Sequence, residues 1–179
     1  MSKVSYVFLA LVLIVILFIS VFLGSCSLAE QLKSAASASC PAWQYMLTIE
    51  YEVISYTDKV ISLLLNISPY LGGAHGMTYL KTFNFDLENN RLLELGDIFN
   101  PDSDYLAYIS GYCRQDLEKQ MLFMQTEPDN DWINEGTDPA VLQNYSRFLL
   151  GPEGLIIRFE AYQVAPGAAG DFSVLIPYS

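Results

Sequence analysis

Asp102–Gln125 reads DSDYLAYISGYCRQDLEKQMLFMQ, and this stretch decides the fold. Its apolar residues recur every three or four positions, which is the spacing of one face of an α-helix. The residues on that face are Leu106, Ile109, Tyr112, Cys113, Leu117, Met121 and Met124. Asp102 and Ser103 are residue types that cap helix N-termini. We therefore predict one long helix over this stretch.

The segments on both sides of the helix alternate apolar and polar residues, a period of two that is typical of half-buried β-strands. The predicted strands are Trp43–Thr57, Lys59–Ser68, Met77–Leu87, Leu92–Leu95, Phe148–Leu150, Leu155–Tyr162 and Phe172–Pro177. Between helix and later strands, Glu127–Pro139 is expected to be an acidic loop and Pro139–Tyr145 a short helix. This order predicts an α+β fold, in which one long helix packs on an antiparallel sheet of short strands.

The N-terminal segment Val4–Gly24 is almost purely apolar, with Lys3 as its only nearby charge. About 20 such residues span a bilayer core, so we predict a transmembrane or signal helix within residues 1–26. Lys3 on the short leading side predicts that the rest of the chain lies outside the cytoplasm. Leu23-Gly24-Ser25-Cys26 resembles a bacterial lipobox, in which the cysteine becomes lipidated. An uncleaved signal anchor, a lipoprotein attached through Cys26 and a secreted form all remain open.

After this segment, residues 27–42 form a linker rich in small residues, and residues 43–179 form the predicted extracytoplasmic domain. All 20 acidic residues lie after residue 27, which leaves the outer part of the chain with a net charge of −12. Such a surface disfavours nucleic acid, because phosphate backbones require a basic face. A cationic protein is a natural partner. The other interpretation is that the acidic surface only maintains solubility.

The three cysteines are Cys26, Cys40 and Cys113, and their spacing matches no zinc motif. In an oxidising compartment Cys40 and Cys113 are a candidate disulfide. The alternative is that Cys113 is a buried helical thiol and Cys40 is free. No cofactor or metal site is expected.

Three segments carry a resemblance to a known family. They are Tyr70-Leu-Gly-Gly-Ala-His-Gly76, Lys81-Thr-Phe-Asn-Phe-Asp-Leu87 with Leu92–Phe99, and Gly154–Gly170 with Ile176-Pro-Tyr178. Together they resemble the extracytoplasmic domain of unknown function, DUF3298, that is found at the C-terminus of the anti-sigma factor RsiV and in the peptidoglycan deacetylase PdaC.

The resemblance implies an α+β fold and, from the RsiV-like members, binding of lysozyme. Because only Met1–Lys3 would face the cytoplasm, we expect no anti-sigma activity, and we expect no deacetylase domain. Where the family usually has an aromatic residue before Ala-Ala-Gly, this chain has Gly167.

The candidate partner-binding residues fall in three places. They are His75 with Gly72 and Gly73, then Asp129, Asp131 and Trp132 in the acidic loop, and then Tyr162 and Pro166 in the following turn. A single histidine with scattered acids does not make a zinc site or a hydrolase triad, so we name no catalytic residue. Asp129-Asn-Asp131 begins like a calcium loop, but Ile133 and Asn134 break the EF-hand pattern.

The sequence thus favours a membrane-attached, non-catalytic binding or sensing module for a cationic wall hydrolase such as lysozyme, or for cell-wall components. Two alternatives are a cell-wall-modifying enzyme that uses His75 and an envelope scaffold lipoprotein.

Overall fold

A computed structural model describes residues 46–71, 76 and 78–178 of the chain. The chain divides into two compact units, Met1–Trp43 and Gln44–Ser179, and all described residues lie in the second. No helix in the described part is long and apolar enough to cross a membrane. The predicted N-terminal helix, the lipidation candidate Cys26 and residues Gly72, Gly73 and His75 lie outside the described residues.

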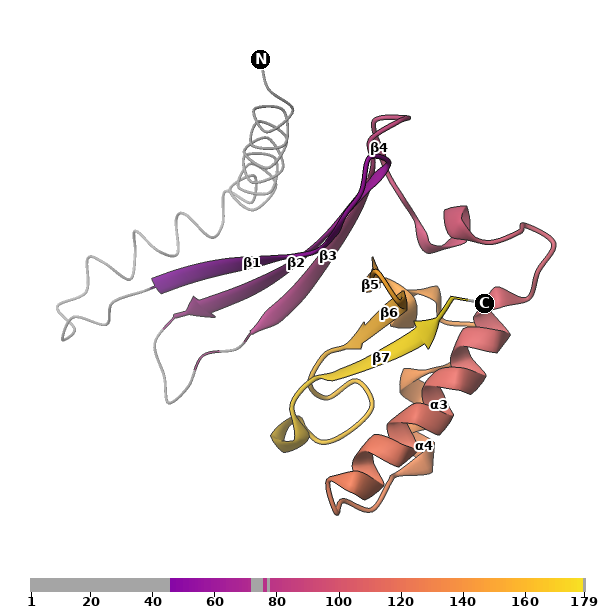
Figure 1. The fold of residues 1–179 in the computed structure, drawn as a ribbon. Helices are drawn as coiled ribbons and strands as arrows, with labels where there is room; N and C mark the ends of the chain where they lie inside the picture. Colours follow the sequence, from indigo (N-terminus) through magenta and orange to yellow (C-terminus); the bar gives the residue numbers. More distant parts are fainter. Residues whose placement is uncertain (1–45, 72–75, 77, 179) are drawn as a thin grey trace, which may run out of the picture. The chain divides into compact units, whose positions relative to one another are not determined.

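The first sheet contains four antiparallel strands in the order β1-β2-β3-β4 (Figure 1). The strands are β1 (Met46–Tyr56), β2 (Val60–Tyr70), β3 (Tyr79–Asp86) and β4 (Arg91–Leu92). The central strand β2 is mostly buried, as its continuous apolar run indicates. Thr57 closes the β1–β2 turn, where its hydroxyl accepts a hydrogen bond from Val60 N at 2.9 Å.

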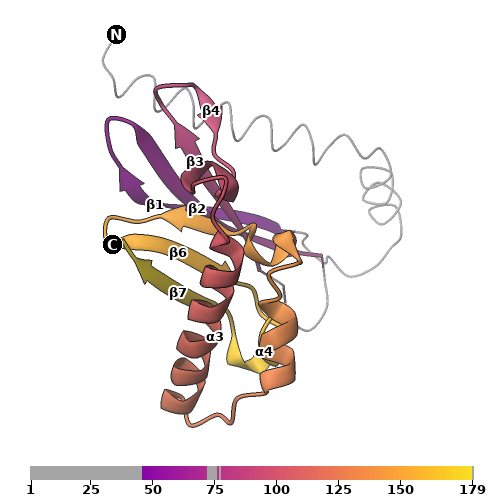
Figure 2. The same ribbon diagram turned by 90° about the vertical axis from the view of Figure 1, so that its right-hand side faces the viewer.

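The second sheet contains three antiparallel strands in the order β5-β6-β7. The strands are β5 (Phe148–Leu150), β6 (Gly154–Phe159) and β7 (Phe172–Pro177). The helix α3 (Tyr105–Phe123) lies along this sheet, with α4 (Asn130–Gly136) beside it (Figure 2). Three short 3₁₀-helices complete the chain: η1 (Leu95–Ile98), η2 (Leu142–Tyr145) and η3 (Gly167–Ala169).

The main core lies between α3 and the second sheet. The predicted inner face of the helix is confirmed for its centre, because Ile109, Cys113, Leu117 and Met121 are all buried. Strands β6 and β7 contribute alternate residues to the same core, as their burial patterns show. Fully burying each such aliphatic side chain stabilises the fold by about 1.5–3 kcal/mol, so this interface carries most of the stability.

The two sheets meet at β5, through a small apolar cluster and a buried polar link. Leu64 and Leu80 of the first sheet pack against Leu149 of the second. The buried Asn84 accepts a hydrogen bond from Ser62 at 2.7 Å and donates one to Phe148 O at 2.8 Å. Because buried amides cost free energy unless they are paired, this link also fixes how the two sheets meet.

The α+β class is confirmed, but four details of the prediction are wrong. Two sheets are present within the described residues where one was expected. The predicted acidic loop contains α4, and the helix expected from Pro139 is instead the shorter η2. The N-cap of α3 is Asp104, whose side chain accepts a hydrogen bond from Ala107 N, rather than Asp102 or Ser103.

Strand β1 is not half-buried as predicted. Leu47, Ile49, Tyr51 and Val53 were assigned to its buried side, yet all four are exposed, Tyr51 to 64%. Ile54, close to the C-terminal end of β1, packs against the cluster of Leu64, Leu80 and Leu149, so the strand meets this core near its end and not along its length.

Candidate functional site

Five of the predicted partner-binding residues lie on two segments that one hydrogen bond joins. Asp129, Asp131 and Trp132 belong to the start of α4, and Tyr162 and Pro166 belong to the loop between β6 and β7. The indole N–H of Trp132 donates a hydrogen bond to the backbone oxygen of Tyr162 at 3.0 Å, which joins the two segments. We call these five residues the acidic–aromatic surface.

The helix α4 positions the acidic half of this surface. Asp129 is its N-cap and accepts a hydrogen bond from Trp132 N at 3.0 Å. Asp131 lies in the first turn, where a negative charge is favourable beside the unpaired backbone N–H groups. Both carboxylates are exposed, and the sequence has no Lys or Arg between Lys119 and Arg147. The local field is therefore negative and uncompensated within this segment.

Tyr162 supplies the aromatic half, and its backbone is held in an unusual conformation. Its φ of 72° is rare for a bulky residue, and its side chain is 66% exposed. The phenol ring lies against Gly167, where any added Cβ would overlap the ring. Residues with an unusual φ of this kind are often found at functional sites.

Gln163 and Gly136, which the sequence analysis did not single out, fix the loop behind Tyr162. The Gln163 amide donates hydrogen bonds to Gly136 O at 3.2 Å and to Asn144 O at 3.0 Å. A Cβ on Gly136 would overlap the backbone oxygen of Gln163, so this close approach requires glycine. The acidic–aromatic surface is consequently preorganised by packing beneath it.

Cys113 is not part of this surface. It is a free thiol, fully buried on the core side of α3, and burial raises its pKa to about 12. This placement matches the alternative in which Cys113 is a buried helical thiol. Cys40 lies outside the described residues, so its state is not described.

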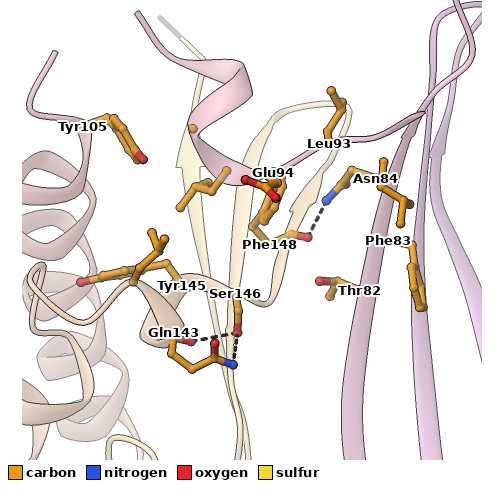
Figure 3. A pocket seen from close by; sticks show the side chains of 14 residues that line it. Thr82, Phe83, Asn84, Leu93, Glu94, Tyr105, Gln143, Tyr145, Ser146 and Phe148 are labelled. Carbon is orange, nitrogen blue, oxygen red and sulfur yellow. Dashed lines mark hydrogen bonds between the residues drawn. The ribbon is translucent and has the colours of Figure 1, made fainter. Parts of the chain in front are cut away.

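The structure also contains a pocket that the sequence analysis missed (Figure 3). It has a volume of about 480 Å³. It is lined by Thr82, Phe83, Asn84, Leu92, Leu93, Glu94, Leu95, Gly96, Tyr105, Leu142, Gln143, Tyr145, Ser146 and Phe148. We call it the Tyr105 pocket. Four segments that lie far apart in the sequence build it, so no single motif could have revealed it.

Ser146 lies in the lining of the Tyr105 pocket. Its hydroxyl donates a hydrogen bond to Gln143 O at 2.8 Å and accepts one from Gln143 Nε2 at 3.2 Å. Within residues 46–71, 76 and 78–178, no group of three or more His, Cys, Asp and Glu side chains is arranged to hold a metal ion. The described residues thus present two features, the acidic–aromatic surface and the Tyr105 pocket.

Comparisons with known proteins identify the relatives of the chain. Residues 96–179 match a family described as a protein of unknown function (DUF3298), and residues 25–78 match a model described as deacetylase PdaC. The chain is 35% identical over 133 residues to the peptidoglycan-N-acetylmuramic acid deacetylase PdaC of Bacillus subtilis, covering 74% of this chain and 28% of that protein.

Two further comparisons agree with this assignment. The chain is 26% identical over 132 residues to the anti-sigma-V factor RsiV of Bacillus subtilis, covering 72% of this chain and 44% of that protein. It therefore spans less than half the length of either curated relative. The crystal structure of a DUF3298 family member from Bacteroides fragilis superposes with a TM-score of 0.59 and 27% identity, covering 84% of this chain and 58% of that one.

Proposed function

Residues 96–179 form a DUF3298 domain, and from this premise we propose that the chain is a membrane-attached, extracytoplasmic binding module that is not itself an enzyme. Its partner is a cationic protein, such as a lysozyme-like wall hydrolase, and the partner binds the acidic–aromatic surface. The apolar segment Val4–Gly24 attaches the module to the membrane, as an anchor or through lipidation of Cys26.

The observation that carries this proposal is that a segment with exposed acidic residues is joined to a segment with an exposed aromatic residue. The half-buried Trp132 donates its indole hydrogen bond to the backbone oxygen of Tyr162, and Asp129 and Asp131 lie at the start of the same short helix as Trp132. Tyr and Trp residues dominate binding energy at protein interfaces. Surrounding carboxylates attract a cationic partner and accelerate its association.

The relatives support a binding role over a catalytic one. One is named as a deacetylase and the other as an anti-sigma factor, and this chain matches only 28% and 44% of their lengths. A region that two proteins with such different activities have in common is more readily explained by a shared binding function than by a shared catalytic reaction.

The direct test is to titrate the full-length chain, held in lipid nanodiscs, with hen lysozyme at low and at high salt. We expect saturable binding that weakens as salt screens the charges. Absence of saturable binding at both salt concentrations would rule out lysozyme as the partner class.

Enzymatic activity is the second candidate function, because PdaC is named as a hydrolytic enzyme. His75, the only histidine of the chain, would be its central residue. Turnover of wall glycans by the full-length protein that His75→Ala abolishes would favour this alternative. No turnover at all would remove this alternative, and turnover that His75→Ala leaves unchanged would remove His75 as its central residue.

A further inference from the structure

The Tyr105 pocket and the acidic–aromatic surface share no residue. The lining of the pocket comes from residues 82–84, 92–96, 105 and 142–148, whereas the acidic–aromatic surface comes from the start of α4 and the loop between β6 and β7. A ligand of the pocket would therefore contact a different set of residues from the partner proposed above.

The mouth and floor of the pocket are apolar. Leu92 and Leu142 stand at its edge and are 51% and 58% exposed, although both are aliphatic. Leu95, Tyr145 and Phe148 are buried and form its floor. Concave sites with mostly apolar walls and a few polar groups are typical of small-ligand binding. An aliphatic segment of a ligand would bury the two exposed leucines.

The charge of the pocket has one sign. Glu94 is its only carboxylate, and the described lining contains no Lys, Arg or His. The nearby Arg91 interacts mainly with Asp97, to which its guanidinium donates a hydrogen bond at 2.8 Å, and its attraction to Glu94 is weaker. An anionic ligand is therefore disfavoured, and a cation is favoured.

Aromatic rings complete the site. In Figure 3, Tyr105 and Thr82 lie on opposite sides of the pocket, with Glu94 and Phe148 between them. Phe99 stacks on one face of the Tyr105 ring, with centroids 4.6 Å apart, and is itself outside the lining. Gly96 leaves room for the Tyr105 hydroxyl, which would lie 3.2 Å from an added Cβ. Rings gathered around a carboxylate bind organic ammonium groups through cation–π attraction.

An ammonium group also needs acceptors for its three N–H donors. Besides the Glu94 carboxylate, side-chain oxygens in the lining belong to Thr82, Gln143 and Ser146. The pocket thus combines an aliphatic mouth, aromatic walls and oxygen acceptors. The aliphatic mouth suits the carbon chain of an alkylammonium ion, and the aromatic walls and oxygen acceptors suit its ammonium group.

We propose that the Tyr105 pocket binds an alkylammonium group on an aliphatic stem, such as a lysine side chain of a peptide or a free alkylamine. This site goes beyond the function proposed above, because it uses different residues and does not require lysozyme as a partner.

The test uses the full-length chain in nanodiscs with ¹³C-labelled leucine methyl groups. Four probes are titrated: N-acetyl-lysine methylamide, N-acetyl-norleucine methylamide, n-pentylammonium and choline. Norleucine keeps the aliphatic stem of lysine and removes the ammonium group. We expect the lysine probe to bind at least about fivefold more tightly than the norleucine probe.

Three variants locate the binding. Glu94→Gln removes the charge but keeps a side-chain oxygen that can accept the hydrogen bond from the N3 backbone of η1, and it is expected to weaken binding of the lysine probe about threefold to tenfold. Tyr105→Leu removes the aromatic ring and is expected to weaken binding of the lysine probe by a similar factor. Glu153→Gln is the matched control, since Glu153 is exposed outside the lining, and it should leave binding unchanged.

Equal binding of the lysine and norleucine probes, no binding of any ammonium probe, or equal effects of Glu94→Gln and Glu153→Gln would each overturn the proposal. Binding of free amines but not of the lysine probe would support it and identify a free amine as the source. Failure of lysozyme binding would leave this result untouched, so the two proposals fail independently.

Discussion

At the residue scale, Cys113 shows how far composition alone can mislead. Its position on the helical stripe predicted burial, and the structure confirms that burial. The count of cysteines in an exported chain equally suggested a disulfide with Cys40. Whether Cys113 is buried or paired depends on the core around α3, and that core is assembled from strands that begin 35 residues later in the chain.

We predict that Cys113 resists alkylation in the native protein. Because burial raises its pKa to about 12, the reactive thiolate is nearly absent at pH 8. Peptide mapping by mass spectrometry after brief iodoacetamide treatment should find Cys113 unmodified, and labelling should appear only after denaturation. Finding Cys113 joined to Cys40 in the oxidised protein would contradict this placement.

A second residue-scale prediction concerns alkaline pH. Burial raises the pKa of Cys113 from 9.0 and that of Tyr145 from 10.0, each to about 12 in the folded state. A raised folded-state pKa contributes stability that is complete below the unfolded pKa and is lost as pH rises through the folded value. The free energy of unfolding should therefore fall between about pH 9 and pH 12. Cys113→Ala should flatten the lower part of this decline, measured by denaturant unfolding against pH.

At the element scale, segments with a strong apolar period were predicted correctly, whereas short elements without such a period were not. The helix over residues 102–125 and most strands follow from their apolar spacing. The helix α4 was missed because seven residues, NDWINEG, contain too few apolar positions to show a stripe. The one sequence feature that indicated this helix was Asp129, because aspartate is a residue type that caps helix N-termini.

Glycines on the two helices provide a matched prediction. Gly136→Ala should destabilise the fold by about 2–4 kcal/mol, because its Cβ would overlap the backbone oxygen of Gln163. Gly111→Ala on α3 meets no atom within 4 Å and should stabilise by up to about 1 kcal/mol. Thermal unfolding followed by circular dichroism distinguishes them, and equal effects would show that the Gly136 contact is not tight.

At the scale of the whole molecule, the sequence predicted the class but not the assembly. Alternation indicates which residues share a face of a strand, but it does not say which strands pair, so two sheets appeared as one. The acidic–aromatic surface was foreseen as separate residues, and only the Trp132–Tyr162 hydrogen bond shows that they meet. The Tyr105 pocket was invisible for the same reason.

The buried polar link between the sheets gives a prediction at this scale. Asn84→Ala removes the acceptor of the Ser62 hydroxyl and the amide donor to Phe148 O, while Leu150 N keeps its hydrogen bond to Ser62 Oγ. Since each unsatisfied buried group costs about 1–3 kcal/mol, we expect a loss of at least 2 kcal/mol in unfolding free energy. Asn89→Ala, in the exposed turn before β4, is the control and should change little. A small effect at Asn84 would mean that the apolar cluster alone holds the sheets together.

The central claim is that the acidic–aromatic surface, and not net charge alone, binds a cationic protein. The most direct measurement compares lysozyme binding by two full-length variants that each lose two charges. Asp129→Asn/Asp131→Asn changes the surface and Asp102→Asn/Asp104→Asn changes the far end of α3, while asparagine retains both helix caps. Calorimetric titration should show clearly weaker binding for the first variant and nearly unchanged binding for the second, and equal losses in both would contradict the claim.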